Sequence, residues 1–326
     1  MGLHMKFLYL LIPLLTLFGC GESEQKTPAS NAEKKLVVGF SQVGSESSWR
    51  TSFSESVKAE AAKRGIDLKF SDAQQKQENQ IKAIRSFIAQ GVDAIIVAPV
   101  VETGWKPVLT EAKRAGIPVV IVDRNMALED DSLYLTRVAS DFVEEGRKAA
   151  RWLMEATEGK CDIVELQGTV GATAAIDRMA GFNEVIAEHE NARIIRTQTG
   201  EFTRSKGKEV MEAFLKAEQG GKSICAVWAH NDEMAIGAAL AIKEAGLDPG
   251  DDILIVSVDA VPDIFKAMAD GDTNATVELS PHMGGPAFDA IDAHRQGKTD
   301  IPKLITIQGD VFTQATAAEE YAKRKQ

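Results

Sequence analysis

Short apolar runs recur along the chain without the polar alternation that marks a half-exposed strand. In the first half they are LVVGF at 36–40, AIIVAP at 94–99 and PVVIVD at 118–123. A continuous apolar run of this length is typical of a parallel strand that is buried on both faces of its sheet. These runs therefore predict the strands of a parallel β-sheet.

Segments with helical character lie between these runs, and each is followed by a glycine. We predict helices over residues 49–64, 75–90 and 104–115, with glycine as the next residue in every case. Glycine suits that position because it reaches positive φ without strain. The order of helix, glycine and strand thus occurs three times, in KRGIDLKF, AQGVDAIIV and RAGIPVVIV. This βα repetition predicts an α/β fold with a right-handed, doubly wound parallel sheet.

A second set of strand-like runs predicts a second lobe of the same kind. Its members are CDIVELQG at 161–168, ARIIRTQTG at 192–200, ICAVWAH at 224–230 and DILIVSVD at 252–259. Helical segments separate them, as in the first set. We place the boundary between the two lobes near Thr136 to Asp141.

A further strand at 275–279 and a helix at 281–295 follow the second set. We expect this segment to return to the first lobe, which would give two doubly wound lobes joined by a hinge of three crossing strands. The expected lobes are an N-terminal one, 35–138 with 279–306, and a C-terminal one, 139–278 with 307–326.

Length and charge agree with two globular lobes. A chain of 326 residues is long enough for two α/β domains with full cores. The formal net charge is −11, and no block of Lys and Arg stands against it. Nucleic-acid binding draws much of its free energy from basic patches, so this composition argues against a nucleic-acid partner.

The N-terminus has the pattern of an export signal. His4 and Lys6 precede an apolar run at 7–18 that is short for a membrane span. The run leads into Leu-Phe-Gly-Cys20, which resembles a lipobox. We therefore expect a lipoprotein signal peptide at 1–19, a lipid on Cys20 and a flexible tether at 20–34. The alternative is a plain signal peptide with a chance cysteine.

Two other cysteines, Cys161 and Cys225, remain in the body of the chain. In an exported protein a pair of cysteines is more often a disulfide than a catalytic or metal site. The sequence has no His/Cys cluster with zinc spacing. We expect neither a metal nor a cofactor.

Polar side chains follow the predicted strands, at the edge where ligands bind in open parallel sheets. They are Glu46, Trp49 and Arg50 after the first strand, then Asp123 and Arg124, Arg178, Asn231 and Asp259, with Glu278 on the linking strand. Carboxylates, guanidinium groups and amides pair well with sugar hydroxyls, which both donate and accept. Trp49 and Phe202 would cover the apolar face of a sugar ring. The set predicts a site for a small neutral polyol.

Each of these residues also has an ordinary structural interpretation. Asp123 and Arg124 could form a surface ion pair, and Trp49 could pack in the core. Arg178 could be a solvated helix residue, while Asn231 and Asp259 could cap helices. Their shared position after buried strands favours the ligand site.

Five long strings carry a resemblance to a known family. They are VGFSQVGSESSWR, DAQQKQENQIKAIRSFIAQGVDAIIVAPVVETGW, VELQGTVGATAAIDR, FTRSKGKEVMEAF and AHNDEMAIGA. The chain resembles the type I periplasmic sugar-binding proteins from Leu36 to about Leu304, and within that family the galactofuranose-binding receptors of bacterial ABC importers.

The resemblance implies a set of sugar contacts and one disulfide. The implied contacts are Glu46, Trp49, Arg50, Asp123, Arg124, Arg178, Asn231 and Asp259, with weaker matches at Phe202 and Glu278. A Cys161–Cys225 disulfide is also implied. The galactose-binding members carry a calcium loop that Asp270 and Asp272 resemble, but Ala275 and Pro281 replace required residues, so we expect no calcium site.

The resemblance and the polar set together lead us to expect a receptor, not an enzyme. It would capture a monosaccharide, galactofuranose or galactose first, by closing its hinge, and present it to an inner-membrane ABC permease. We expect a periplasmic monomer that touches the membrane only through its N-terminal lipid.

Two rival functions stay open at this point. A chemoreceptor or sensor kinase could use the same sugar-binding step. A glycosidase could use Glu46 and Asp259 as paired carboxylates. Against the glycosidase, we expect neighbouring arginines to lower the pKa of both carboxyls.

Overall fold

The computed structural model describes residues 1, 2, 4 and 35–324. The chain divides into two units, Met1–Lys34 and Lys35–Gln326, and all elements below belong to the second. Cys20 and the tether predicted at 20–34 lie outside the described residues, as does most of the predicted signal peptide. The described residues form two six-stranded sheets.

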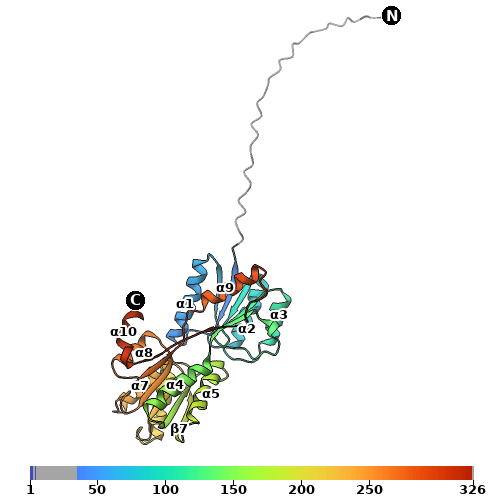
Figure 1. Ribbon diagram of the computed structural model, residues 1–326. Coiled ribbons are helices and arrows are strands. Elements are labelled where there is room, and N and C mark those ends of the chain that lie inside the picture. The colour runs from blue at the N-terminus through green and yellow to red at the C-terminus, as the bar shows by residue number, and fades with distance from the viewer. Residues whose placement is uncertain (3, 5–34, 325–326) are drawn as a thin grey trace. The chain divides into compact units, whose positions relative to one another are not determined.

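The first sheet is parallel throughout and has the strand order β11-β5-β4-β3-β1-β2. Its strands are β1 (Val37–Gln42), β2 (Asp67–Asp72), β3 (Ala94–Val97), β4 (Val119–Val122), β5 (Thr136–Ser140) and β11 (Leu304–Ile307). Around it lie α1 (Ser48–Lys63), α2 (Gln77–Gln90), α3 (Lys106–Arg114), η1 (Asp131–Leu133) and α9 (Gly284–Arg295) (Figure 1). We call this part the first lobe.

The second sheet has the order β12-β10-β9-β8-β6-β7, and β12 alone among its described strands is antiparallel. Its strands are β6 (Lys160–Gln167), β7 (Asn191–Thr199), β8 (Ala226–Ala229), β9 (Leu254–Asp259), β10 (Ala275–Glu278) and β12 (Val311–Thr313). Its helices are α4 (Phe142–Ala156), α5 (Thr173–Ile186), α6 (Arg204–Ala217), α7 (Asp232–Glu244), α8 (Pro262–Ala269) and α10 (Gln314–Arg324). We call this part the second lobe.

The predicted α/β architecture is confirmed, and its local causes are visible. Every residue of β3, β4 and β8 is buried, as expected for apolar strands covered on both faces. Gly65, Gly91 and Gly116 follow α1, α2 and α3 with φ of 67°, 63° and 72°. Glycine therefore ends these three helices because the chain turns there through the left-handed region.

The chain passes between the two sheets three times. The connections run from β5 to α4, from β10 to α9 and from β11 to β12. We call residues 140–142, 278–284 and 307–311 the hinge segments. Helix α9 packs against α1, so the last third of the chain contributes to both lobes.

Several elements differ from the sequence prediction. Residues 136–140, expected to be a boundary, form strand β5 of the first sheet. Strands β11 and β12 and helix α10 were not predicted. β11 alternates between exposed and half-buried residues, and β12 has three residues, so neither has a long apolar run. Each helix in the described part of the chain is too short or too polar to span a bilayer.

Candidate functional site

A buried cavity lies where strand ends of the two lobes meet. Its empty space is about 290 Å³, part of which is open to solvent. Nine of the ten predicted ligand residues line it: Glu46, Trp49, Arg50, Asp123, Arg124, Arg178, Phe202, Asn231 and Asp259. Ser47, Ala174 and Leu279 complete the lining. Both lobes therefore contribute to a single cavity.

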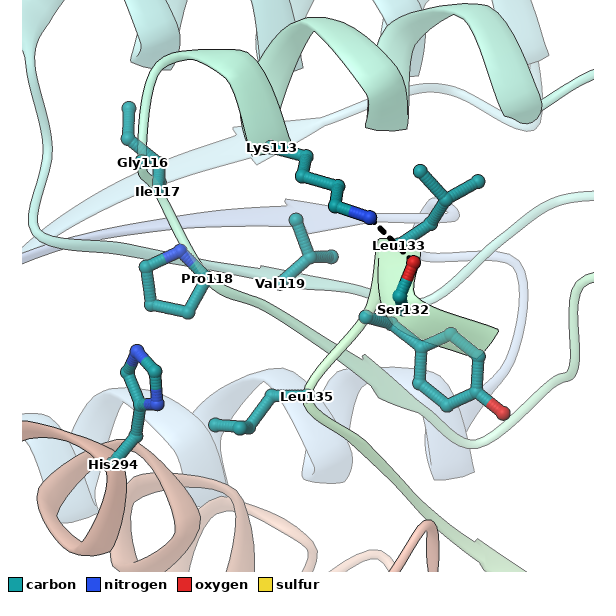
Figure 2. A pocket seen from close by; sticks show the side chains of 10 residues that line it. Lys113, Gly116, Ile117, Pro118, Val119, Ser132, Leu133, Leu135 and His294 are labelled. Carbon is teal, nitrogen blue, oxygen red and sulfur yellow. Dashed lines mark hydrogen bonds between the residues drawn. The ribbon is translucent and has the colours of Figure 1, made fainter. Parts of the chain in front are cut away.

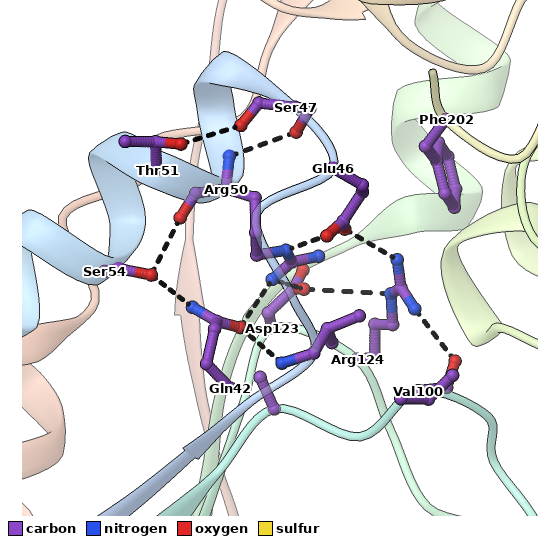
Figure 3. A network of polar contacts seen from close by, with 12 residues as sticks. Gln42, Glu46, Ser47, Arg50, Thr51, Ser54, Val100, Asp123, Arg124 and Phe202 are labelled. Carbon is purple, nitrogen blue, oxygen red and sulfur yellow. Dashed lines mark hydrogen bonds and ion pairs between the residues drawn. The ribbon is translucent and has the colours of Figure 1, made fainter. Parts of the chain in front are cut away.

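The first lobe provides a cluster of two arginines and two carboxylates. Arg50 donates from Nη1 to Asp123 Oδ2 at 2.7 Å and from Nε to Glu46 Oε1 at 3.1 Å. Arg124 donates to the carbonyl of Val100 at 2.8 Å and forms longer ion pairs with the same two carboxylates (Figure 3). Because all four side chains are held by one another, their orientation is fixed before a ligand arrives.

The second lobe provides Arg178, which three groups hold in place. Its Nε donates to Glu145 Oε2 at 2.9 Å, and its Nη1 donates to the carbonyl of His230 at 2.6 Å. Its guanidinium carbon lies 5.3 Å from the centre of the Phe142 ring. The third nitrogen, Nη2, lies 3.9 Å from Asp259 Oδ1. Arg178 is buried, so it is not the solvated helix residue of the alternative interpretation.

Asn231 and Phe202 come from adjacent turns of the second lobe and hold each other. The Asn231 side chain accepts from Met234 N and thereby caps α7, while its amide donates to the carbonyl of Phe202 at 3.1 Å. The Phe202 ring lies 5.2 Å from the guanidinium carbon of Arg124 in the first lobe. A cation over an aromatic face is favourable, so this contact links the two lobes directly.

Three buried atoms in the cavity have unused hydrogen-bonding capacity. Glu46 Oε2, Arg124 Nε and Arg178 Nη2 have no hydrogen-bond partner among the described residues. A buried polar atom without a partner costs about 1–3 kcal/mol. One acceptor and two donors, from both lobes, are therefore available to a ligand that offers hydroxyl groups.

Burial shifts the pKa of two charged side chains that line the cavity, Asp259 and Arg124. Burial raises the pKa of Asp259 well above its ordinary value; Arg178 opposes this, and Asp232 adds to it. Our expectation that neighbouring arginines lower the pKa of Asp259 is therefore wrong, because the loss of hydration outweighs the attraction of Arg178, 3.9 Å away, and of Arg50. Burial and the nearby Arg50 lower the pKa of Arg124 to about 10.

Three of the lining residues have an unusual backbone conformation. Asp123, Phe202 and Asp259 have φ of 61°, 62° and 129°, in a region that residues with side chains rarely adopt. Such conformations occur where surrounding structure enforces them, and they cluster at ligand clamps. Here the strained residues follow β4, precede α6 and end β9.

The side chains that line the cavity are largely removed from solvent. Eight of the nine residues named above are buried, with Asp123 at 1% and Arg178 at 2% exposure, and Glu46 is half-buried with a buried side chain. Asp123 and Arg124 are therefore not an exposed surface pair. The hinge segments are the covalent connections between the two lobes that line the cavity.

One predicted residue lies elsewhere, and other important residues were missed. Glu278 does not line the cavity; its Oε1 pairs with Arg324 of α10 at 3.3 Å beside the hinge segments. Glu145 was missed although it holds Arg178, because nothing in its own sequence neighbourhood indicates that contact. His230 does not line the cavity, and its Nε2 lies 3.0 Å from Glu165 Oε1.

Cys161 and Cys225 form a disulfide with 5.3 Å between the Cα atoms, as the resemblance implied. It joins the start of β6 to the residue before β8, at the opposite end of these strands from the cavity. Among the described residues, no group of three or more His, Cys, Asp or Glu side chains could hold a metal ion. Asp270 and Asp272 instead pair with Lys266 and Lys243.

A second cavity of about 520 Å³ lies in the first lobe, where β4 begins (Figure 2). Apolar residues around Ile117 and Leu135 line it, together with Lys113 and His294. The ammonium of Lys113 already donates to Ser132 Oγ. This cavity lacks convergent charged groups from several elements, so we assign the candidate site to the cavity between the lobes.

The family model and the relatives that match this chain all belong to the same kind of protein, the periplasmic binding proteins. The sequence model of the periplasmic binding protein domain matches residues 38–299. The galactofuranose-binding protein YtfQ of Escherichia coli is 59% identical over 291 residues, which cover 89% of this chain and 92% of that protein. The ribose import binding protein of Bacillus subtilis is 32% identical, over 94% of this chain and 97% of its own.

Solved structures agree in fold. The periplasmic binding protein component of the arabinose ABC transporter from Shewanella sp. ANA-3, bound to α- and β-L-arabinofuranose, is 77% identical with a TM-score of 0.88, over 89% of this chain and 96% of that one. A galactofuranose-binding protein has 59% identity and the same TM-score, over 89% and 98% of the two chains.

Proposed function

The chain belongs to the periplasmic binding protein domain family, and we propose that it is the substrate-binding receptor of an ABC sugar importer. It captures a monosaccharide in the cavity between its lobes and releases it to a permease in the inner membrane. One relative is the periplasmic binding protein component of an arabinose ABC transporter and another is a galactofuranose-binding protein, and the chain matches both over nearly their whole length.

One observation supports the ligand class most directly. Glu46 Oε2, Arg124 Nε and Arg178 Nη2 are buried in one cavity and have no hydrogen-bond partner within the described chain. A hydroxyl both donates and accepts, so a neutral polyol can satisfy all three groups. A molecule that lacks one of these hydroxyls would leave one of the three buried atoms without a hydrogen-bond partner, which is the basis for selectivity.

We propose a furanose sugar as the ligand. One relative is described as bound to L-arabinofuranose and two as galactofuranose-binding. These sugars share a five-membered ring and differ in their exocyclic carbons. Galactofuranose, galactose and arabinose are therefore the first candidates.

We propose that the two lobes close on the sugar as rigid bodies. The N-terminal lobe would comprise residues 35–138 with 279–306, and the C-terminal lobe residues 139–278 with 307–326. Sheet membership supports this division in part: β10 and β12 lie in the second sheet, but β5 and β11 of the first sheet extend to Ser140 and Ile307, slightly beyond the proposed boundaries. Closure would exclude water and bring both lobe surfaces into the arrangement that a permease recognises. We further propose that one chain, with its one cavity, acts as a monomer.

The experiment is a thermal-shift panel on the purified protein. Galactose, a source of galactofuranose, arabinose, ribose and glucose are each added at millimolar concentration. A ligand at 100 times its Kd adds about 2.7 kcal/mol of stability, which raises Tm measurably. We expect a rise with arabinose, galactose or galactofuranose that disappears in Arg178→Ala and persists in Arg193→Ala, an exposed arginine of the same lobe. No rise with any of the sugars would contradict the proposed ligand.

We propose that the protein has no enzymatic activity. The Glu46 carboxylate is held by ion pairs from Arg50 and Arg124 to its Oε1. The raised pKa of Asp259 would suit a general acid, which makes the assay worthwhile. Turnover of an aryl glycoside, lost in Asp259→Asn, would contradict the receptor function. A sensor role would use the same binding step and a different partner.

We also propose that Cys20 carries a lipid that holds the protein at the periplasmic face of a membrane. The support is the apolar run at 7–18 followed by Gly19 and Cys20. The test is metabolic labelling with a fatty acid and partition into detergent. Label and partition should both be lost in Cys20→Ala; equal release of wild type and variant as soluble protein would contradict the lipid.

A further inference from the structure

A contact between the lobes lies immediately beside the cavity. Ser48 begins α1 in the first lobe, and Glu233 lies in the first turn of α7 in the second. Ser48 donates to Glu233 Oε1 twice, from Oγ at 2.7 Å and from the backbone nitrogen at 3.2 Å. The residues are 185 positions apart and lie in different lobes, so this contact exists only when the lobes are together.

The second oxygen of the same carboxylate is held within its own lobe. Arg204 donates from Nε to Glu233 Oε2 at 2.7 Å and from Nη2 to Asp263 Oδ2 at 2.8 Å. Glu233 is 6% exposed, whereas Ser48 and the Arg204 side chain are exposed, so the contact lies at the edge of the interface between the lobes. Arg204 thus orients a carboxylate whose other oxygen points to the opposite lobe.

The receiving end is the N-terminus of a helix, which favours a negative charge. The first backbone N–H groups of a helix have no partner within it, and the helix dipole makes this end partly positive. The first turn of α1 reads Ser-Trp-Arg-Thr and has no acidic residue of its own to meet this need. Glu233 supplies that charge from the other lobe.

The same turn of α1 carries ligand-site residues. Trp49 and Arg50 directly follow Ser48, and both line the cavity. Trp49 also donates from Nε1 to the carbonyl of Leu279 in a hinge segment at 2.6 Å. Whatever holds Ser48 therefore holds the part of the first lobe that faces the sugar.

We propose that Glu233 is a positioning residue that touches no ligand and binds the first turn of α1 across the lobes. This contact sets the fraction of ligand-free molecules in which the lobes are closed. Through that fraction it sets the affinity for sugar. This inference rests on the proposed function for its effect on sugar binding, but its conformational part does not. A protein whose binding-competent form is populated only in part has an affinity lowered by that fraction, equally for every ligand.

The experiment has one arm that needs no ligand. Small-angle X-ray scattering compares the radius of gyration of ligand-free wild type, Glu233→Gln and Ser48→Ala. We expect a larger radius in Glu233→Gln and a smaller increase in Ser48→Ala, in which the backbone nitrogen still donates. Glu244→Gln is the matched control, because Glu244 lies on the same helix and pairs with Lys208 of the same lobe. A radius unchanged in Glu233→Gln would overturn the proposal.

The second arm measures Kd by calorimetry for L-arabinose and D-galactose. Loss of a charge-assisted hydrogen bond should raise Kd about tenfold in Glu233→Gln, by the same factor for each sugar that wild type binds. A change in the ratio between sugars would overturn the proposal, because it would mean direct contact with ligand. Failure of wild type to bind either sugar counts against the proposed ligand, and the scattering arm then decides on Glu233. Circular dichroism checks that each variant is folded.

Discussion

Arg178 Nη2 and Asp259 Oδ1 lie 3.9 Å apart, too far for a hydrogen bond and close enough for an ion pair. Arg178 comes from α5 and Asp259 from the end of β9, so both belong to the second lobe. A sugar hydroxyl placed between them would accept from the guanidinium and donate to the carboxylate. The pair is therefore spaced to be completed by a hydroxyl.

Replacement of Arg178 should remove sugar binding through geometry as well as charge. Arg178→Lys keeps the positive charge, but one ammonium cannot serve Glu145, the His230 carbonyl and a ligand in the planar arrangement that guanidinium allows. We expect Kd to rise at least tenfold, which is about 1.4 kcal/mol, as measured by calorimetry. Arg193→Lys, at an exposed ion pair, should bind as wild type does. Equal affinities of the two variants would contradict this role.

Asp259→Asn should stabilise the ligand-free protein while weakening its affinity. Because burial raises the pKa of Asp259, the folded state holds this proton at a pH where the unfolded chain has lost it. Stability from Asp259 is thus present at low pH and lost as pH rises from about 4 through the folded pKa. The gain in free energy of unfolding of Asp259→Asn over wild type should grow across that window and then level off. Denaturant unfolding at several pH values measures it, and a gain that shrinks as pH rises would contradict it.

Sugar affinity should depend on pH in the opposite sense. The ionised carboxylate of Asp259 accepts hydrogen bonds from hydroxyls better than the protonated form does. Wild-type Kd should therefore rise as pH falls from neutrality, and this dependence should be smaller in Asp259→Asn. Calorimetry at matched ionic strength is the measurement, and parallel pH profiles would show that another group is responsible.

Gly168→Ala should impair binding without touching the ligand. A Cβ on Gly168 would lie 1.9 Å from Phe202 Cζ, so the ring would have to leave its present position in the cavity wall. We expect Kd to rise about tenfold, which corresponds to about 1.4 kcal/mol. The loss of a ring contact contributes ~0.5–1.5 kcal/mol, and local strain adds to it. Gly285→Ala is the control, since a Cβ there meets no atom within 4 Å. Unchanged affinity in Gly168→Ala would argue against Phe202 as part of the site.

Removal of the disulfide should change stability and leave affinity alone. Cys161 and Cys225 are 64 residues apart, and closing a loop of that length contributes about 4 kcal/mol in the chain-entropy model. The bond lies at the ends of β6 and β8 that are away from the cavity. The double variant Cys161→Ser/Cys225→Ser should unfold at lower denaturant concentration with an unchanged Kd. A shift in Kd would mean that the bond also restrains the site.

The sequence predicted those features that depend on local pattern. Strands such as β3 and β4 were found because they are apolar on both faces, and residues such as Asp123 and Asp259 were found because ligands bind at the ends of parallel strands. Nine of the ten predicted ligand residues share one cavity for this reason.

Features that depend on distant contacts were not predicted. β11 is recognisable only through its pairing with β5, far away in the chain. Glu145 and Glu233 are ordinary first-turn acids in sequence, and only the packed structure places one against Arg178 and the other against Ser48. Glu278 was predicted to line the site because its strand lies next to β9, but the sequence does not reveal that its side chain pairs with Arg324.

Because the chain passes between the sheets three times, the two sheets can be completed only late in the synthesis of the chain. The first sheet lacks its edge strand β11 until residue 307 exists, and the second lacks β12 until residue 313 does. Neither lobe can therefore finish folding while the C-terminus is still being synthesised. Pairings between segments this distant in sequence form slowly compared with local contacts, so each sheet gains its edge strand late in folding.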